Sequence, residues 1–192
     1  MAFARGFKSQ SERRSAEYRK QLGLASHEPL SASKLASELA VTVWETRDVA
    51  GLSAKALTTL NDEVDQSWSA LTMRIGPRNL IVFKPVASKG RRNSVIMHEL
   101  AHIILGHELA QACVLEDGSL VPGNFNQDQE DEADWLAGTL LLPRPALIAI
   151  RQRGMSDSEA SEHHLVSVEM LRWRFSPQAG WPSRSSSASG RE

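Results

Sequence analysis

His98-Glu99-Leu100-Ala101-His102 is the stretch of this sequence that decides the fold. It has the pattern H-E-x-x-H, with two histidines four residues apart. An α-helix has 3.6 residues per turn, so both imidazoles would lie on one face of a helix and could bind one metal ion. Glu99 follows the first histidine directly, where its carboxylate can reach a water molecule at the metal without being a ligand. The pattern predicts a zinc site of the kind found in peptidases.

The residues on either side of this motif predict that its helix is buried. Val95-Ile96-Met97 precede the motif, and Ile103-Ile104-Leu105 follow it. A helix that is apolar on nearly all sides belongs in a core. Ionisable side chains at its centre are costly unless they are paired or bind a metal. Two satisfied core histidines are the alternative, but that reading gives no reason for the glutamate between them.

The length and composition indicate one globular domain, either alone or with small appendages. The chain has 192 residues, of which 41% are hydrophobic, and its net charge of −1 gives no indication of general nucleic-acid affinity. Its start lacks the apolar segment of a secretory signal, and no apolar run approaches the ~20 residues of a membrane helix. Cys113 is the single cysteine, so neither a disulfide nor a cysteine-type zinc site is expected. We therefore expect a cytoplasmic protein with no membrane partner.

The pattern of apolar and turn-forming residues predicts an α+β fold. Two apolar segments, Trp68–Ile75 and Leu80–Phe83, flank a Gly-Pro-Arg-Asn turn and predict an antiparallel hairpin. Val41–Trp44 is β-branched and aromatic, which favours a further short strand. Besides the helix of the motif, helices are predicted over Ser9–Leu22, Ser31–Leu39, Ser53–Leu60 and Glu130–Leu142, and in two pieces between Ser156 and Phe175.

Polar segments set the predicted boundaries of the motif helix and of the domain. Ser88–Ser94 is expected to be a loop in which Asn93 or Ser94 caps the helix, and Gly106 is expected to end it. From residue 176 onward Ser, Pro, Gly and Arg dominate, which predicts a disordered tail over 176–192. Residues 1–175 are then a single domain, in which 156–175 form a helix–turn–helix-like subregion.

A catalytic zinc normally takes three protein ligands and keeps one position for water. His107 is the nearest third candidate, but it follows His102 by five residues, beyond the helix-ending Gly106. The metzincin pattern requires the glycine three residues and the third ligand six residues after the second histidine, so it does not fit. We expect His107 to be a surface histidine near the helix end rather than a ligand.

The acidic segment Glu130-Asp131-Glu132-Ala133-Asp134 is a better source of the third ligand. Acidic residues often lie at a solvated helix N-terminus, but here a strongly apolar run follows. Glu130 and Asp134 lie four apart on one face, so one carboxylate can bind zinc while the other accepts the outer N–H of a ligand histidine. We assign Glu130 as the ligand and Asp134 as the orienting residue. Glu132 is the rival of Glu130, because only the phase of the helix separates them.

The two motifs together resemble the ImmA/IrrE family of metallo-endopeptidases. The resemblance rests on residues 98–107, with the sequence His-Glu-Leu-Ala-His-Ile-Ile-Leu-Gly-His, and on Glu130–Ala137 with the apolar run that ends at Pro143. Leu136 stands where the family usually has an aromatic residue, with Trp135 beside it, which changes packing and leaves the metal chemistry in place. The resemblance extends over roughly residues 7 to 176.

The resemblance implies a zincin-like fold, in which a small antiparallel sheet packs on the H-E-x-x-H helix and on a second, glutamate-bearing helix, with further short helices. It implies zinc bound by His98, His102 and Glu130, and it makes Glu99 the general base and acid. Members of the family typically cleave a cognate helix-turn-helix repressor of a mobile element or stress operon. A repressor of this kind is therefore the expected protein partner. The sequence assigns no residue to the oxyanion.

A non-enzymatic function is the alternative. Ser156–Phe175 has helix–break–helix spacing, and Arg172 and Arg174 could meet phosphate groups. The chain would then be a metal-binding transcriptional regulator, or a binding module with the same fold. The near-zero net charge and the acidic second helix argue against nucleic acid as a partner. For the enzyme, we expect an extended substrate along a strand edge of the Trp68–Phe83 hairpin.

Overall fold

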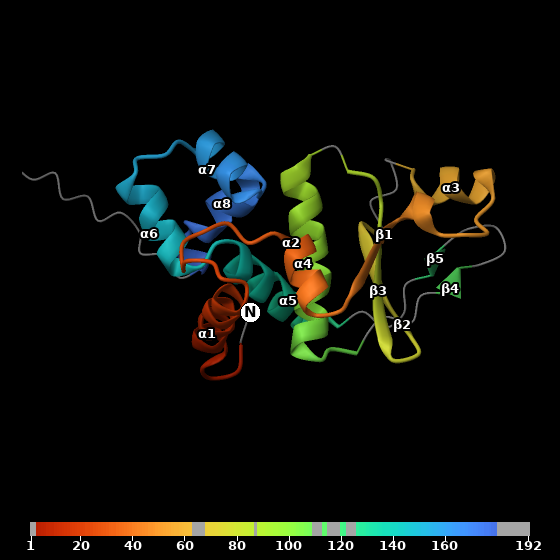
Figure 1. Ribbon diagram of the computed structural model, residues 1–192, viewed down its shortest axis with the longest axis horizontal. Coiled ribbons are helices and arrows are strands. Elements are labelled where there is room, and N and C mark those ends of the chain that lie inside the picture. The colour runs from red at the N-terminus through yellow and green to blue at the C-terminus, as the bar shows by residue number, and fades with distance from the viewer. Residues whose placement is uncertain are drawn as a thin grey trace, which may run out of the picture.

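A small sheet and a layer of helices meet along one long helix, α4 (Figure 1). The computed structural model describes residues 3–62, 68–86, 88–108, 113–114, 120–121 and 126–179. Within these residues, the strands β1 (Thr42–Glu45), β2 (Ala70–Ile75) and β3 (Arg78–Phe83) form one sheet in the order β1-β3-β2. The strands β4 (Cys113–Val114) and β5 (Leu120–Val121) form a separate antiparallel pair. The expected α+β class is confirmed.

The sheet is mixed rather than purely antiparallel. Strands β2 and β3 form the predicted hairpin, with Ile75 opposite Arg78 across a turn in which Gly76 has a φ of 59°. Strand β1, in contrast, runs parallel to β3, so the prediction of an antiparallel sheet is wrong for this strand. A parallel pair needs a long crossover, which the 3-10 helix η1 (Thr46–Asp48), α3 (Ala54–Leu60) and β2 provide here. β-Propensity predicts a strand but not the direction of its partner.

The helices are arranged around α4 (Lys89–Leu105) and α5 (Gln127–Leu141), which pack against each other. α4 also contacts β2 and β3, so it links the sheet to the helical layer. α2 (Ala32–Glu38) covers α4, and α1 (Phe7–Gln21) covers α5. The remaining helices are α6 (Arg144–Gln152), α7 (Asp157–His164), α8 (Val168–Arg174) and the 3-10 helix η2 (Pro177–Ala179). The sequence patterns did not predict α6.

The core fills the space between α4, α5 and the sheet. Leu100 and Ala101 of the H-E-x-x-H motif are fully buried, as are Leu136 and Leu140 of α5 and Ile81 of β3. The motif therefore lies on a helix that packs into the core through Ile96, Met97, Leu100 and Ala101. The other flanking residues, Val95 and Ile103–Leu105, are half-buried, so the predicted burial holds for only part of the flanks. The polar side of α4 is left to face the N-terminal turns of α5.

Two helix starts differ from the predictions. α4 begins at Lys89, where the Ser88 hydroxyl caps it by accepting the N–H of Arg91, so the predicted loop over 88–94 is wrong. Asn93 is no cap: its side chain is buried, accepts the N–H of Ala32 at 2.7 Å and donates to the carbonyl of Leu165 at 3.0 Å. These long-range hydrogen bonds stabilise a polar helical turn that local propensity did not favour.

The start of α5 also lies earlier than expected. Asn126 is its N-cap, and its side-chain oxygen accepts the N–H groups of Asp128 and Gln129. The acidic residues therefore occupy the first two turns of α5 rather than its first residue. This is a favourable place for them, because the N-terminal end of a helix carries partial positive charge.

The C-terminal segment packs more tightly than predicted. Gly138 of α5 lies so close to α8 that an added Cβ would be 2.5 Å from the ring of Trp173. The predicted tail begins too early, because residues 177–179 form η2 with Ala179 buried; the rest of it, 180–192, lies outside the described residues. In the described part of the chain, no single helix is long and apolar enough to cross a membrane. Helices α5 and α6, which meet at a bend, are together long and apolar enough, but by length and composition only.

Candidate metal centre

Two imidazoles of α4 and one carboxylate of α5 converge where these helices face each other. The Nε2 atoms of His98 and His102 are 3.0 Å apart. The Glu130 carboxylate lies 3.2 Å from His98 Nε2 and 3.5 Å from His102 Nε2. Among the described residues, these three form the one group of His, Cys, Asp or Glu side chains whose ligand atoms lie within 4.8 Å of one another. The structure thus brings together the three residues assigned as ligands.

The spacing and chemistry of this group fit a zinc ion. Tetrahedral zinc with ligand bonds of 2.0–2.1 Å places neighbouring ligand atoms about 3.3 Å apart, close to the separations found here. Two imidazole nitrogens and a carboxylate oxygen are a common donor set of catalytic zinc sites. The Nδ1 atoms of both histidines contact other residues, so their Nε2 lone pairs are left to point at one centre. The donor set leaves a fourth position for water.

The electrostatics of the group favour a positive charge between its members. Burial lowers the pKa of His98, but its hydrogen bonds with Asp134 and Glu130 outweigh this and raise that pKa to about 10. Hydrogen bonds with His102 and His98 hold the pKa of Glu130 well below its usual range. A cation at this centre therefore meets an ionised carboxylate.

Asp134 contacts His98 from the outer side. The Nδ1–H group of His98 donates to the Asp134 carboxylate at 2.9 Å. This contact selects the tautomer in which the Nε2 of His98 is free to bind a metal. The Asp134 side chain is 59% exposed, so solvent weakens the interaction. The geometry is the one expected for an orienting residue.

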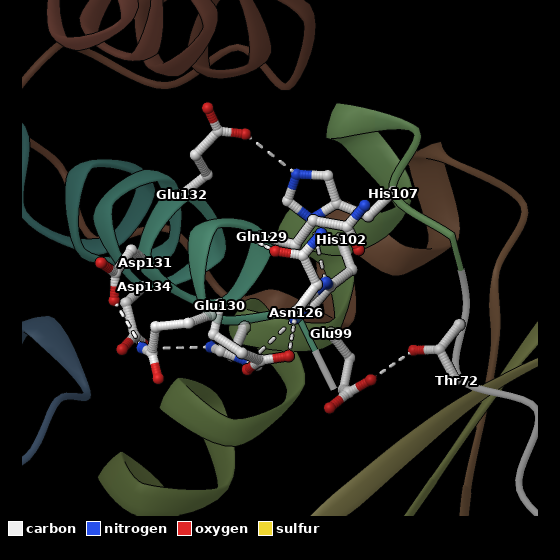
Figure 2. A network of polar contacts seen from close by, with 12 residues as sticks. Thr72, Glu99, His102, His107, Asn126, Gln129, Glu130, Asp131, Glu132 and Asp134 are labelled. Atoms are coloured by element: carbon white, nitrogen blue, oxygen red, sulfur yellow. Dashed lines mark hydrogen bonds and ion pairs between the residues drawn. The ribbon is translucent and has the colours of Figure 1, made fainter. Parts of the chain in front are cut away.

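Glu99 follows His98 directly in α4 and points toward the sheet. Its carboxylate accepts a hydrogen bond from the Thr72 hydroxyl at 2.5 Å (Figure 2). Thr72 lies on β2 and is 3% exposed, so the hydroxyl is held in place by the packing of β2 on α4. No sequence motif contains Thr72. Its inward-facing position on a hairpin strand was the available signal, but the strand's distance from the motif was unknown.

His107 is not a surface residue, so that expectation is wrong. Its side chain is only 6% exposed, its Nδ1 lies 3.0 Å from the Nδ1 of His102, and its Nε2 lies 3.2 Å from the Glu132 carboxylate. Burial lowers the pKa of His107. Figure 2 shows Glu132 reaching His107. Glu130 instead contacts His98 and His102. The two rival glutamates thus have different partners.

The family model Peptidase M78, described as the IrrE N-terminal-like domain, matches residues 52–176. The chain belongs to this family. The match contains both motifs, and it confirms the resemblance to the ImmA/IrrE peptidases. Membership in the M78 family indicates a metallopeptidase, for which zinc is the typical metal.

Comparison with solved structures adds little to the family match. A Mycobacterium tuberculosis transcriptional regulator is 14% identical, with a TM-score of 0.49 over 90% of this chain and 47% of that chain. The chain therefore spans about half the length of that protein. No curated protein matches the chain.

The arginines that suggested phosphate binding are otherwise engaged. Arg174 of α8 is 3% exposed, and its guanidinium donates to the carbonyl of Leu142 at 3.0 Å. Arg172 is exposed and pairs with Asp157 at 2.9 Å. Since α8 buries Arg174 against the end of α5, it does not present both arginines on an open face, as a DNA-reading helix would.

Proposed function

We propose that this M78 protein is a zinc-dependent endopeptidase that hydrolyses a peptide bond in a specific protein. The convergence of two histidines of the H-E-x-x-H helix with Glu130 of α5 is the observation that carries the proposal. Family membership supports the same reaction class. Neither fact alone requires turnover, because a structural metal site could use the same ligands.

The proposed mechanism assigns each residue one task. His98, His102 and Glu130 would hold the metal, and Asp134 would keep His98 in the tautomer that binds it. When bound, zinc polarises the peptide carbonyl and makes a nearby water molecule more acidic. Glu99 takes a proton from the attacking water and donates it to the leaving nitrogen.

Thr72 supports Glu99 in this task. Its hydroxyl donates to one oxygen of the Glu99 carboxylate, which leaves the other oxygen free to accept a proton. This hydrogen bond holds the Glu99 carboxylate in one orientation before water attacks the peptide carbonyl. The link also ties the general base to β2.

Strand β2 is the proposed binding edge for the substrate. It is an outer strand of the described sheet, because β3 pairs with it on one side and separates it from β1. An extended peptide could add to this edge through backbone hydrogen bonds. Since Thr72 of β2 contacts Glu99, a peptide on this edge would run past the general base.

We further propose that the substrate is a helix-turn-helix repressor. The support is the resemblance to ImmA/IrrE peptidases, whose members typically act on such proteins, and a gene for a repressor beside this one would identify the first candidate. The M78 protein would then act by removing a repressor rather than by binding DNA itself.

Glu99→Gln tests the enzyme proposal. Purified wild-type and variant proteins, loaded with zinc, would be incubated with a candidate helix-turn-helix repressor chosen from the neighbouring genes. We expect the variant to bind zinc as tightly as wild type but to leave the repressor intact, because glutamine cannot carry the proton. Inactivation of the repressor that survives the substitution would contradict the proposal and favour a binding function.

A further inference from the structure

His107 and Glu132 lie outside the group of three ligands and yet reach it through His102. The contacts run in sequence from His102 Nδ1 to His107 Nδ1 at 3.0 Å and from His107 Nε2 to the Glu132 carboxylate at 3.2 Å. The His107 side chain is 6% exposed and that of Glu132 is 30% exposed. Neither residue has a role in the proposed mechanism.

The turn at the end of α4 explains why His107 lies beside His102. Gly106 has a φ of 70° and donates its N–H to Ile103 at 3.2 Å, while the N–H of His107 donates to the carbonyl of His102 at 3.1 Å. This pair of bonds is a Schellman motif, in which the residue after the left-handed glycine contacts the helical residue five positions earlier. His107, the residue after this glycine, therefore packs on His102, which lies five positions earlier in the helix.

With a metal at the Nε2 atoms of His98 and His102, one pattern of protons satisfies the remaining contacts of His102 and His107. The Nε2 of His102 faces His98 and Glu130, so its lone pair must be free if it is to bind a metal and its proton resides on Nδ1. That Nδ1–H donates to the Nδ1 of His107. The Nε2–H of His107 then donates to the Glu132 carboxylate, which can only accept.

We propose that His107 and Glu132 are positioning residues that fix the tautomer and ring orientation of His102 as a metal ligand. The inference rests on the proposed zinc site and extends it. Asp134 orients His98 directly with a carboxylate, whereas Glu132 acts on His102 through the intervening imidazole of His107. Contacts of this kind raise the basicity of a ligand histidine and reduce the cost of ordering it.

Two substitutions of nearly equal size at His107 test the proposal. His107→Leu removes the acceptor, while His107→Asn can place an amide oxygen near the position of Nδ1 and accept from His102. We expect zinc affinity, measured by competition with a chelator, to fall about 10- to 100-fold in His107→Leu and by less in His107→Asn. Asp131→Asn is the control, because Asp131 lies beside Glu132 and contacts Gln127 instead; its affinity should equal that of wild type.

Proton NMR of the zinc-loaded proteins gives a second readout that packing alone would not change. The Nδ1–H of His102 should give a downfield imidazole signal in wild type and His107→Asn, and this signal should be lost by exchange in His107→Leu. If His107→Leu does not fold, Glu132→Ala is the substitute, with an expected loss at the lower end of the same range.

The outcomes separate the two proposals. Equal zinc affinities for wild type, His107→Leu and Glu132→Ala would overturn the role of His107 and Glu132 while leaving the peptidase intact. Equal losses in the Leu and Asn variants would also overturn it, because they would show that size rather than hydrogen bonding matters. A wild-type protein that binds no zinc would overturn both proposals.

Discussion

The two halves of α5 have the same backbone but different surroundings. In the first half, Glu130 and Glu132 are partly exposed and face the histidines at the end of α4. In the second half, every residue from Trp135 to Leu141 is buried. The first half of α5 therefore presents charged groups to the proposed metal centre, while the second half anchors the helix in the core.

The two ends of α5 also differ in charge, with carboxylates at the N-terminal end and arginines of other helices at the C-terminal end. The acidic end meets histidines, whereas the guanidinium of Arg19 donates to the carbonyl of Leu140 at 2.8 Å and that of Arg174 donates to the carbonyl of Leu142. Arg19 is 1% exposed, and burial lowers its pKa to about 10. Cations at a helix C-terminus satisfy its last carbonyls and favour its dipole. The buried half of α5 thus fixes the position of the helix, and with it the position of Glu130 at the proposed metal centre.

Glu130→Ala should give the largest effect and break the polar half alone. It removes a proposed zinc ligand, so we expect zinc affinity to fall by more than the roughly 100-fold loss that follows removal of a residue that only contacts a ligand. The thermal stability of the metal-free protein should change little. Chelator competition and calorimetry measure the two quantities. Glu132→Ala is the matched control, and a larger loss of affinity in that variant would reverse the assignment of the two glutamates.

His164 of α7, near the Arg19 that contacts the anchored end of α5, should make the stability depend on pH. Burial, with His163 and Arg19 nearby, lowers the pKa of His164 from 6.5 to about 4. Between these values the unfolded chain binds the proton and the folded chain does not, so stability falls as the pH falls. We expect this histidine to account for a loss of about 2 kcal/mol between pH 7 and pH 5.

Urea unfolding at both pH values, on wild type and His164→Leu, isolates this contribution. The variant should lose less stability than wild type over the same interval, whatever its stability at pH 7. The same pH dependence in both proteins would show that other groups carry the effect.

Thr72→Val tests the link between the polar half and the sheet. The substitution keeps the shape of the side chain but removes the hydrogen bond to Glu99. We expect kcat for repressor cleavage to fall about 10-fold, as the loss of one hydrogen bond to a charged group would cause, with unchanged zinc affinity. Thr42→Val, at an exposed position of β1, should leave kcat unchanged. An unchanged kcat in Thr72→Val would remove Thr72 from the mechanism.

Gly138→Ala should give the smallest effect, confined to the anchored half. The added Cβ would press on the ring of Trp173, at a cost of about 2 kcal/mol, and alanine recovers about 1 kcal/mol through its higher helix propensity. We expect a net loss of about 1 kcal/mol in urea unfolding. Adding Trp173→Leu to Gly138→Ala should abolish this penalty relative to Trp173→Leu alone, and additive effects would contradict the proposed contact.

The sequence predicted the features that helical periodicity determines. His98 and His102 had to share a face, and Glu130 and Asp134 were chosen as a pair with the same spacing; the structure brings all four side chains together. The hairpin was predicted because its turn residues interrupt two apolar segments. In each case a short local pattern carries the information.

Three features were not predicted: the contact of Thr72 with Glu99, the direction of β1, and helix α6. The first two depend on contacts between segments that are distant in the sequence. Thr72 reaches Glu99 only because β2 packs on α4, and β1 pairs with β3 in a direction that its sequence does not state. Pro143 directly follows the C-cap of α5 and hides the start of helix α6 in the sequence. Proline is also common at the start of a helix, and Pro145 lies in the first turn of α6, so this signal was available.

The location of zinc in crystals of the zinc-loaded protein tests the central claim most directly. Anomalous diffraction at the zinc absorption edge should give one peak about 2.0–2.2 Å from His98 Nε2, His102 Nε2 and a Glu130 oxygen. Neither Glu132 nor His107 should be a ligand. A peak bound by Glu132 or His107, or no peak between α4 and α5, would contradict the account.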